Sequence, residues 1–161
     1  MHMKIGVLSD THLYGVNETF ETILDQHLSN VDMILHAGDY VGEEIMMFLE
    51  RGNFYGVQGN MDTPAIKQRL PDRRIIRIGS YKIGLAHGWG SRKGLEERLL
   101  KEMEPVDVLV YGHSHTPVNH VTQGVLLFNP GTATGLTSKG NHSIGLLHIG
   151  DEIRGEIIPV D

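Results

Sequence analysis

Short apolar runs alternate with amphipathic segments along the first half of the chain. The runs at 3–8, 32–36 and 54–57 have the length and composition of strands, and the first is apolar on both faces. A strand that is apolar on both faces is typical of the centre of a parallel sheet. The intervening segments 17–29 and 43–50 carry apolar residues near helical spacing. This alternation predicts a right-handed β-α-β-α-β unit with parallel strands.

The predicted helices have recognisable ends and inner faces. Asn17 is expected to cap the first helix, and Glu18 and Glu21 suit its positive amino end. The inner face of the second helix is expected to consist of apolar residues, namely Ile45, Met46 and Leu49.

The pattern changes after residue 60. A short helical piece is expected between the prolines at 64 and 71, followed by a hairpin made of 74–78 and 82–86. An amphipathic helix at 95–103 and a buried strand at 107–111 come next. Four short strands punctuated by glycine are then expected at 118–122, 125–128, 143–149 and 152–158. This tail predicts an antiparallel or mixed second sheet.

These elements predict an α/β fold with two facing mixed β-sheets flanked by helices, which is a four-layer α/β/β/α sandwich. The 161 residues fit one domain, and 40% hydrophobic with 21% charged residues is ordinary for a globular protein. The chain has no cysteine, which excludes disulfides and thiolate metal ligands and is compatible with the expected cytoplasmic location.

Charge and hydropathy argue against two classes of partner. The formal net charge is −6, and no long run of lysine or arginine suggests a surface for duplex nucleic acid. The apolar run at 5–8 is too short for a membrane span or signal sequence, so no membrane contact is expected. Because Met3 is an alternative start, His2 is not counted in the chemistry.

Potential metal ligands follow the predicted strands. Asp10 and His12 follow the first strand, Asp39 follows the second, and Asn60 follows the third. Two further strands precede the histidines of the set, which are His87, His113 and His115. Residues i and i+2 of an extended chain point to one side, and ligands of open α/β sheets bind at carboxyl strand ends. These side chains are therefore expected to meet.

The motifs D-x-H, G-D, G-N-x-D, H-G and G-H-x-H occur in this order between Asp10 and His115. They resemble the five motifs of the calcineurin-like metallophosphoesterase superfamily. The compact length and the Asn129-Pro130-Gly131 turn resemble its small prokaryotic phosphodiesterase branch. The resemblance implies a single metallophosphoesterase domain over residues 1–161 and the four-layer fold.

The resemblance also implies two divalent metal ions bridged by Asp39. One ion would be bound by Asp10, His12, Asp39 and His115. The other would be bound by Asp39, Asn60, His87 and His113. Seven ligands are too many for one tetrahedral zinc ion. Manganese is the first choice, and nickel, iron, zinc or cobalt suit the same nitrogen and oxygen ligands.

The implied reaction is hydrolysis of a small phosphodiester by a metal-bridging hydroxide. The implied catalytic residues are Asp39, Asn60 and His113, and Asn60 is expected to stabilise charge on the phosphoryl oxygens. Trp89, beside His87, is a candidate to line the substrate mouth together with Asn60.

Three further residues lie in or next to the motifs and are expected to affect the ligands or the leaving group: Asp62, His36 and Met61. Asp62 and His36 are candidates to orient a metal-binding histidine, as hydrogen-bond acceptors behind the ligands. For His36 the alternative is a structural histidine at a strand end, with its hydrogen bonds made locally. Met61 stands where many members of the superfamily carry a histidine that assists the leaving group. This departure leaves the general acid unassigned. The remaining histidines match no motif and are expected to be structural: His27, His120, His142 and His148.

Two other functions are considered, a non-catalytic scaffold and a nuclease. The chain could be a non-catalytic metal-binding scaffold, as the eukaryotic retromer scaffold subunit resembles this fold but has an altered metal site. A nuclease of the same superfamily usually adds a capping or DNA-binding region, for which 161 residues leave no room. The resemblance and the loop at 13–16 also lead us to expect a homodimer.

Overall fold

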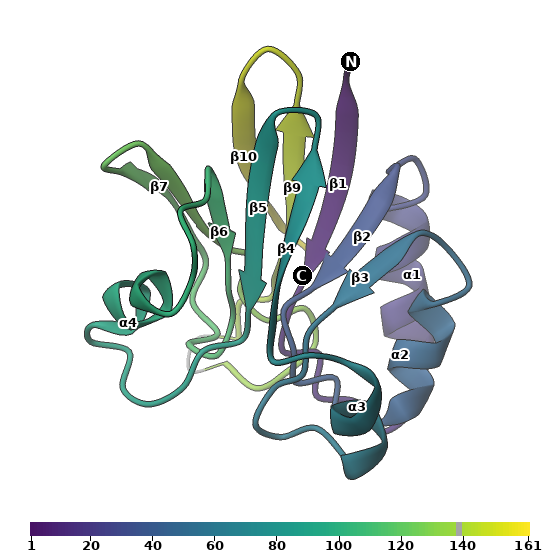
Figure 1. Cartoon of the computed structure of the whole chain (residues 1–161). Helices are drawn as coiled ribbons and strands as arrows, with labels where there is room; N and C mark the ends of the chain where they lie inside the picture. Colours follow the sequence, from purple (N-terminus) through teal and green to yellow (C-terminus); the bar gives the residue numbers. More distant parts are fainter. Residues whose placement is uncertain (138–139) are drawn as a thin grey trace.

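The computed structural model describes residues 1–137 and 140–161. Over these residues the apolar runs form strands and the amphipathic segments form helices (Figure 1). The strands of the first half and the hairpin are β1 (Met3–Leu8), β2 (Met33–His36), β3 (Phe54–Gly56), β4 (Arg73–Ile78) and β5 (Tyr81–Ala86). The strands that follow are β6 (Val108–Val110), β7 (Val118–Thr122), β8 (Val125–Asn129), β9 (Ser143–Ile149) and β10 (Ile153–Pro159). The helices are α1 (Glu18–His27), α2 (Glu43–Leu49), α3 (Pro64–Arg69) and α4 (Leu95–Lys101).

The first sheet has the strand order β10-β9-β1-β2-β3. β1, β2 and β3 are parallel, with Ile5 opposite Met33 and Ile34 opposite Phe54, as the alternating pattern predicts. β9 and β10 are antiparallel to their neighbours and lie on the other side of β1. β1 is therefore a central strand, which explains why it is apolar on both faces.

The second sheet has the strand order β4-β5-β6-β8-β7. β5, β6 and β8 are parallel, while β4 and β7 pair antiparallel at the two edges. The prediction that the whole tail joins this sheet is wrong, since β9 and β10 return to the first sheet. The short, glycine-punctuated sequences of β9 and β10 do not indicate which sheet they join, because both sheets contain antiparallel strands.

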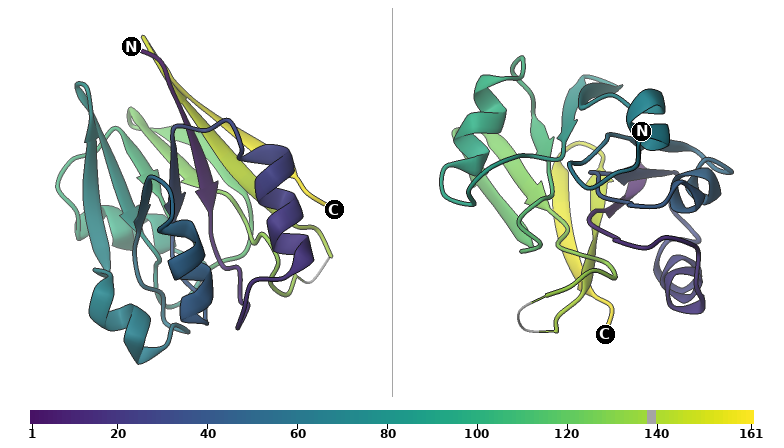
Figure 2. Two further views of the ribbon diagram at one scale, coloured as in Figure 1. Left: turned by 90° about the vertical axis from the view of Figure 1, so that its right-hand side faces the viewer. Right: turned by 90° about the horizontal axis from the view of Figure 1, so that it is seen from below.

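The two sheets face each other across the main core, and helices cover their outer faces (Figure 2). The core between the sheets includes Ile5, Val7, Leu85, Val110 and Phe128, all fully buried. α1 and α2 cover the first sheet through residues such as Phe20 and Ile45, and α4 covers the second through Leu95 and Leu99. The predicted α/β/β/α sandwich is confirmed.

Helix ends follow the local sequence. The Asn17 side chain accepts a hydrogen bond of 2.8 Å from the backbone N–H of Phe20, as expected of an N-cap. The helices predicted at 17–29 and 95–103 are shorter than expected, and end at His27 and Lys101. Among the described residues, no helix is both long and apolar enough to cross a membrane.

Replacing Asn17 by alanine should lower the free energy of unfolding by about 1 kcal/mol, because the Phe20 N–H loses its acceptor. Thr19→Ala, at an exposed position of the same helix, is the matched control and should change it by less than about 0.5 kcal/mol. Urea denaturation followed by circular dichroism measures both. Equal values for the two variants would contradict the capping role.

Candidate metal centre

The strand ends that carry potential ligands meet at one edge of the two sheets. Asp10 follows β1, Asp39 follows β2 and His87 follows β5, while His113 and His115 follow β6. β1 and β2 are parallel, as are β5 and β6, so each pair ends at the same edge, which is the lower edge in Figure 1. The architecture therefore brings together residues that lie far apart in the chain.

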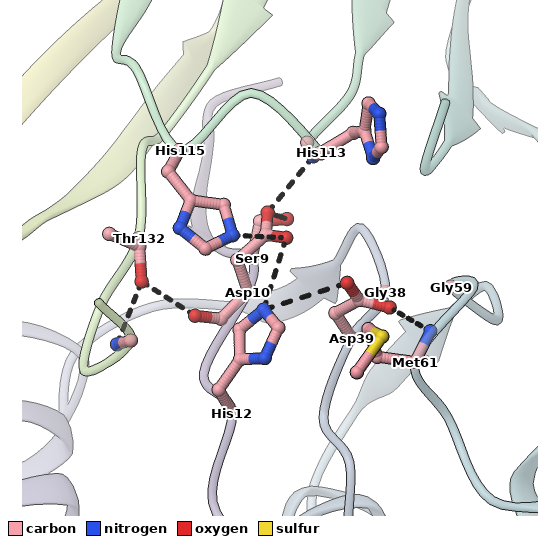
Figure 3. A network of polar contacts seen from close by, with 12 residues as sticks. Ser9, Asp10, His12, Gly38, Asp39, Gly59, Met61, His113, His115 and Thr132 are labelled. Carbon is pink, nitrogen blue, oxygen red and sulfur yellow. Dashed lines mark hydrogen bonds and ion pairs between the residues drawn. The ribbon is translucent and has the colours of Figure 1, made fainter. Parts of the chain in front are cut away.

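Five of the predicted ligands converge there, and four of them are labelled in Figure 3. They form two groups, in each of which the potential ligand atoms lie within 4.8 Å of one another: Asp10 with His12 and His115, and Asp10 with Asp39 and His87. Oδ1 of Asp10 lies 3.2 Å from Nε2 of His115, 3.6 Å from Nε2 of His12 and 3.8 Å from Nε2 of His87. Asp10 is thus common to both groups.

Asp39 also faces both groups. Its Oδ2 lies 3.2 Å from Nε2 of His87 and 3.5 Å from Nε2 of His12. Its other oxygen, Oδ1, accepts a hydrogen bond of 2.8 Å from the backbone N–H of Met61. One carboxylate oxygen is therefore held by the backbone while the other is directed at the cluster. The bridging role of Asp39 stays a prediction.

Backbone carbonyls orient two of the imidazoles. Nδ1 of His87 donates to the carbonyl of Ala37 at 2.8 Å, and Nδ1 of His115 donates to the carbonyl of Leu136 at 2.9 Å. Because Nδ1 is used by a carbonyl in each case, Nε2 faces the carboxylates and is the nitrogen that can bind a metal once it is deprotonated. This is the arrangement that metal-binding histidines use. The sequence carried no signal for these carbonyls.

Five of the seven predicted ligands adopt a left-handed backbone conformation. Their φ angles are 52° for Asp10, 47° for His12, 61° for Asp39, 72° for His113 and 61° for His115. Residues other than glycine rarely take this conformation, which costs about 1 kcal/mol or more each. Such strain persists only where the surroundings enforce it, and it is concentrated at functional sites.

The second oxygen of Asp10 is held by its neighbours. Oδ2 accepts hydrogen bonds from the Ser9 hydroxyl at 2.5 Å and from the backbone N–H of His113 at 3.1 Å (Figure 3). A Cβ atom at Gly112 would lie 2.6 Å from this oxygen, so only glycine allows the chain to pass here. Burial opposes ionisation of Asp10, but the imidazoles of His115 and His12 hold its pKa below the usual range.

The carboxylates raise the pKa values of the histidines in the cluster. Burial alone would lower the pKa of His87, but the carboxylates of Asp39 and Asp10 raise it above the usual range. The nearby carboxylate of Asp10 likewise raises the pKa of His115. Carboxylates and imidazoles therefore stabilise one another in the absence of metal, and a metal ion must displace protons from these imidazoles when it binds.

A loop after β8 supports the cluster from behind. The Thr132 hydroxyl donates to the Asp10 carbonyl at 2.6 Å, and the Thr134 hydroxyl donates to the Thr11 carbonyl at 2.5 Å. Buried Asn129 donates to the Gly112 carbonyl at 3.1 Å. From the sequence we weighed Gly131-Thr132 as a phosphate contact and favoured a plain turn, so the support that Thr132 and Thr134 give to the ligand loop was missed. Their one signal was that, like the ligands, they follow a buried strand.

The predicted support by Asp62 and His36 needs correction. Asp62 accepts hydrogen bonds from the backbone N–H groups of Asp39, Val41 and Gly59, at 3.0, 2.8 and 2.7 Å, and so orients the Asp39 loop rather than a histidine. Nδ1 of His36 accepts from the N–H of Gly38 at 3.0 Å. Burial lowers the pKa of His36 to about 3, which keeps this acceptor neutral. Both side chains therefore hold backbone segments next to the ligands: His36 holds Gly38, and Asp62 holds Asp39 and Gly59.

Asn60, His113 and Trp89 lie beside the cluster rather than within it. Nε2 of His113 donates to the Gly90 carbonyl at 2.8 Å, which leaves Nδ1 as the nitrogen available for a ligand role. The His113 ring lies 5.4 Å from the His87 ring, measured between centroids. Asn60 and Trp89 border a cavity of about 170 Å³ that reaches His87.

The residues of the cluster fit a divalent metal. Within the cluster, three buried polar atoms lack a hydrogen-bond partner among the described residues, and they are Oδ1 of Asp10, Nε2 of His12 and Nε2 of His87. A buried polar atom without a partner is costly, so such atoms indicate an interaction that the protein chain alone does not supply. Carboxylate oxygens and neutral imidazole nitrogens are suitable ligands for manganese, iron, nickel, cobalt or zinc.

The sequence as a whole matches the family description "calcineurin-like phosphoesterase superfamily domain" over residues 3–152. The chain belongs to this superfamily. The match covers the five motifs and nearly all of the strands described above, so the calcineurin-like phosphoesterase fold and the metal-dependent class of the protein are established.

Individual calcineurin-like relatives agree with this assignment. The chain is 37% identical to a probable metallophosphoesterase of Methanocaldococcus jannaschii, over 99% of this chain and 82% of that protein. It is 29% identical to a phosphodiesterase of the same organism, over 90% and 92% of the two chains. The structure of Vps29 from Entamoeba histolytica complexed with Zn²⁺ matches with a TM-score of 0.70 and 26% identity, over 99% and 100% of the chains.

Replacing Asp62 by asparagine should lower the free energy of unfolding of the metal-free protein by about 1–3 kcal/mol. An amide group would face backbone N–H donors that now have a carboxylate acceptor. Metal affinity should fall as well, because the Asp39 loop loses its support. Denaturation with a chelator and calorimetric metal titration measure the two effects.

Asp72→Asn is the matched control, because Asp72 is an exposed acid ten positions further along. It should leave both quantities nearly unchanged. If Asp62→Asn behaved like this control, the role of Asp62 in holding the Asp39 loop would be refuted.

Proposed function

We propose that the protein is a dinuclear metal-dependent phosphodiesterase. The observation that carries this proposal is the convergence of Asp10, Asp39 and three histidines on two adjoining groups, with unpartnered buried atoms aimed at their centre. Manganese is the metal that we expect. The name of the phosphodiesterase relative, at 29% identity, supports diesters as the substrate class.

Divalent ions bound at this site would lower the pKa of an attacking water and stabilise negative charge on the phosphoryl oxygens. The protein supplies the ligands in fixed positions. Ser9 and Met61 hold one oxygen each of Asp10 and Asp39, so the two carboxylates need little reorganisation to bind cations.

Asn60 and His113 are the further residues that we assign to the reaction. Asn60 is exposed at the edge of the cavity beside His87, where its amide can donate to a phosphoryl oxygen. His113 can contribute Nδ1, since its Nε2 is used by the Gly90 carbonyl. The left-handed backbone of His113 also aims its N–H at Asp10.

A metal-binding scaffold is the alternative that the Vps29 similarity supports. That Vps29 structure was solved with Zn²⁺, so metal binding by itself does not separate a scaffold from an enzyme. Hydrolytic activity does. The homodimer, its contact through the exposed loop around Tyr14, and the cytoplasmic location stay predictions.

The metal-stripped protein should not hydrolyse aryl phosphodiesters, and manganese should restore activity with two ions bound per chain. Asp39→Asn should reduce both activity and ion content, because the oxygen that faces His12 and His87 loses its charge. The measurements are a metal-by-substrate activity screen and elemental analysis of the saturated protein.

Asp25→Asn, which changes an exposed acid on α1, is the control and should keep full activity and two ions. One ion per chain at saturation would contradict the dinuclear centre. Failure to hydrolyse any diester with manganese, nickel, iron, zinc or cobalt would contradict the phosphodiesterase and favour the scaffold.

Met61 makes the rate sensitive to the leaving group. Its side chain is 56% exposed beside Asp39, and a thioether cannot donate a proton to the departing oxygen. A positioned general acid typically contributes about 10²–10⁴-fold. We therefore expect the rate to fall steeply as the pKa of the leaving phenol rises, across a series of substituted phenyl diesters.

Met61→His should flatten this dependence if its imidazole reaches the leaving oxygen, whereas Met61→Leu should keep it steep and serves as the control. A shallow dependence in the unmodified protein, with the chemical step limiting the rate, would show that another residue acts as the acid.

A further inference from the structure

A cavity beside the metal centre has the composition of a subsite for a ring. It holds about 170 Å³ and reaches from His87 and Asn60 to Trp89. Ala86 and Leu99 supply an apolar part of its lining. Its four charged residues cancel in formal charge, since Lys67 and Arg73 stand with Asp72 and Glu102. The cavity therefore does not favour a second anionic group.

Trp89 contributes the aromatic surface of this cavity. Trp89 is 51% exposed, although large aromatic side chains gain much from burial. The guanidinium of Arg98 lies 4.9 Å from the centre of the indole and covers part of it. Trp89 borders the cavity and Arg98 does not, so the contact with Arg98 leaves part of Trp89 available to the cavity.

The loop that carries Trp89 is fastened at several points. Arg98 donates hydrogen bonds to the carbonyls of Trp89 at 2.6 Å, Ser91 at 2.5 Å and Lys93 at 2.9 Å. Between them, the Gly90 carbonyl accepts from Nε2 of His113. The backbone on both sides of Trp89 is thus held in place before any ligand arrives, which reduces the entropy lost when a ring stacks on the indole.

We propose that this cavity binds a planar aromatic ring, carried on one ester of the phosphoester substrate, against the indole of Trp89. The proposal rests on the proposed function, because that function places the phosphoryl group between Asn60 and the metal ligands. An aryl ring and a nucleobase share the required chemistry, which is a flat π face that can stack on the indole.

The test uses the non-hydrolysable pair phenylphosphonate and methylphosphonate, which carry a phenyl and a methyl group on the same phosphonate. Trp89 is the single tryptophan of the chain, so its fluorescence reports directly on the cavity. In the manganese-loaded protein, phenylphosphonate should change this fluorescence and bind about tenfold more tightly than methylphosphonate. Adenosine 5′-monophosphate as a third ligand shows whether a nucleobase is preferred over a phenyl ring.

Variants assign the preference to the indole, with calorimetry as the readout because the fluorophore is lost. Trp89→Leu should abolish the preference for phenylphosphonate while it keeps the affinity for methylphosphonate, and Trp89→Phe should retain part of the preference. Tyr14→Leu, which removes an aromatic residue that is 84% exposed elsewhere, should keep all of it.

Equal affinities of the two phosphonates for the unmodified protein would overturn the proposal, whatever the variants do. A ring preference that survives Trp89→Leu would overturn it too. The two proposals fail separately, because ring binding without hydrolysis of any diester refutes only the phosphodiesterase. Diester hydrolysis with equal phosphonate affinities refutes only the aromatic subsite.

Discussion

The carboxylate of Asp10 is the group on which the rest of the site depends. It is fully buried, and one oxygen accepts from Ser9 and from the His113 backbone while the other faces three imidazoles. A buried charge of this kind is tolerated only when it is paired and hydrogen-bonded. The two sheets, the loop after β8 and Gly112 are arranged so that these partners reach it together.

The loops that bring these ligands together have strained backbone conformations. The chain turns sharply as it leaves β1, β2 and β6, through residues in the left-handed conformation: Asp10, His12, Asp39, His113 and His115. Asp62 and Thr132 offset part of the cost of that strain through hydrogen bonds to the backbone of the same loops. The backbone around the ligands is therefore held before a ligand binds, so that metal binding requires little reorganisation.

Much of the fold and site could be predicted from the sequence because the signals were local. Periodicity located the strands, and Asp10, Asp39 and His87 were identified because each directly follows an apolar run. What escaped prediction depends on distant pairing. The return of β9 to β1, the carbonyls of Ala37 and Leu136, and Thr132 behind Asp10 are contacts between segments with no shared local pattern.

The return of the last two strands to the first sheet has a consequence for the order of assembly. β9 pairs with β1, and Thr132 reaches an Asp10 carbonyl that lies 122 positions earlier. During synthesis, β1 is therefore made long before its neighbour β9 and before Thr132, which supports the loop of Asp10. Non-local pairings of this kind slow folding. The potential ligands from Asp10 to His115 are therefore synthesised before the strand and the loop that hold the Asp10 segment in place.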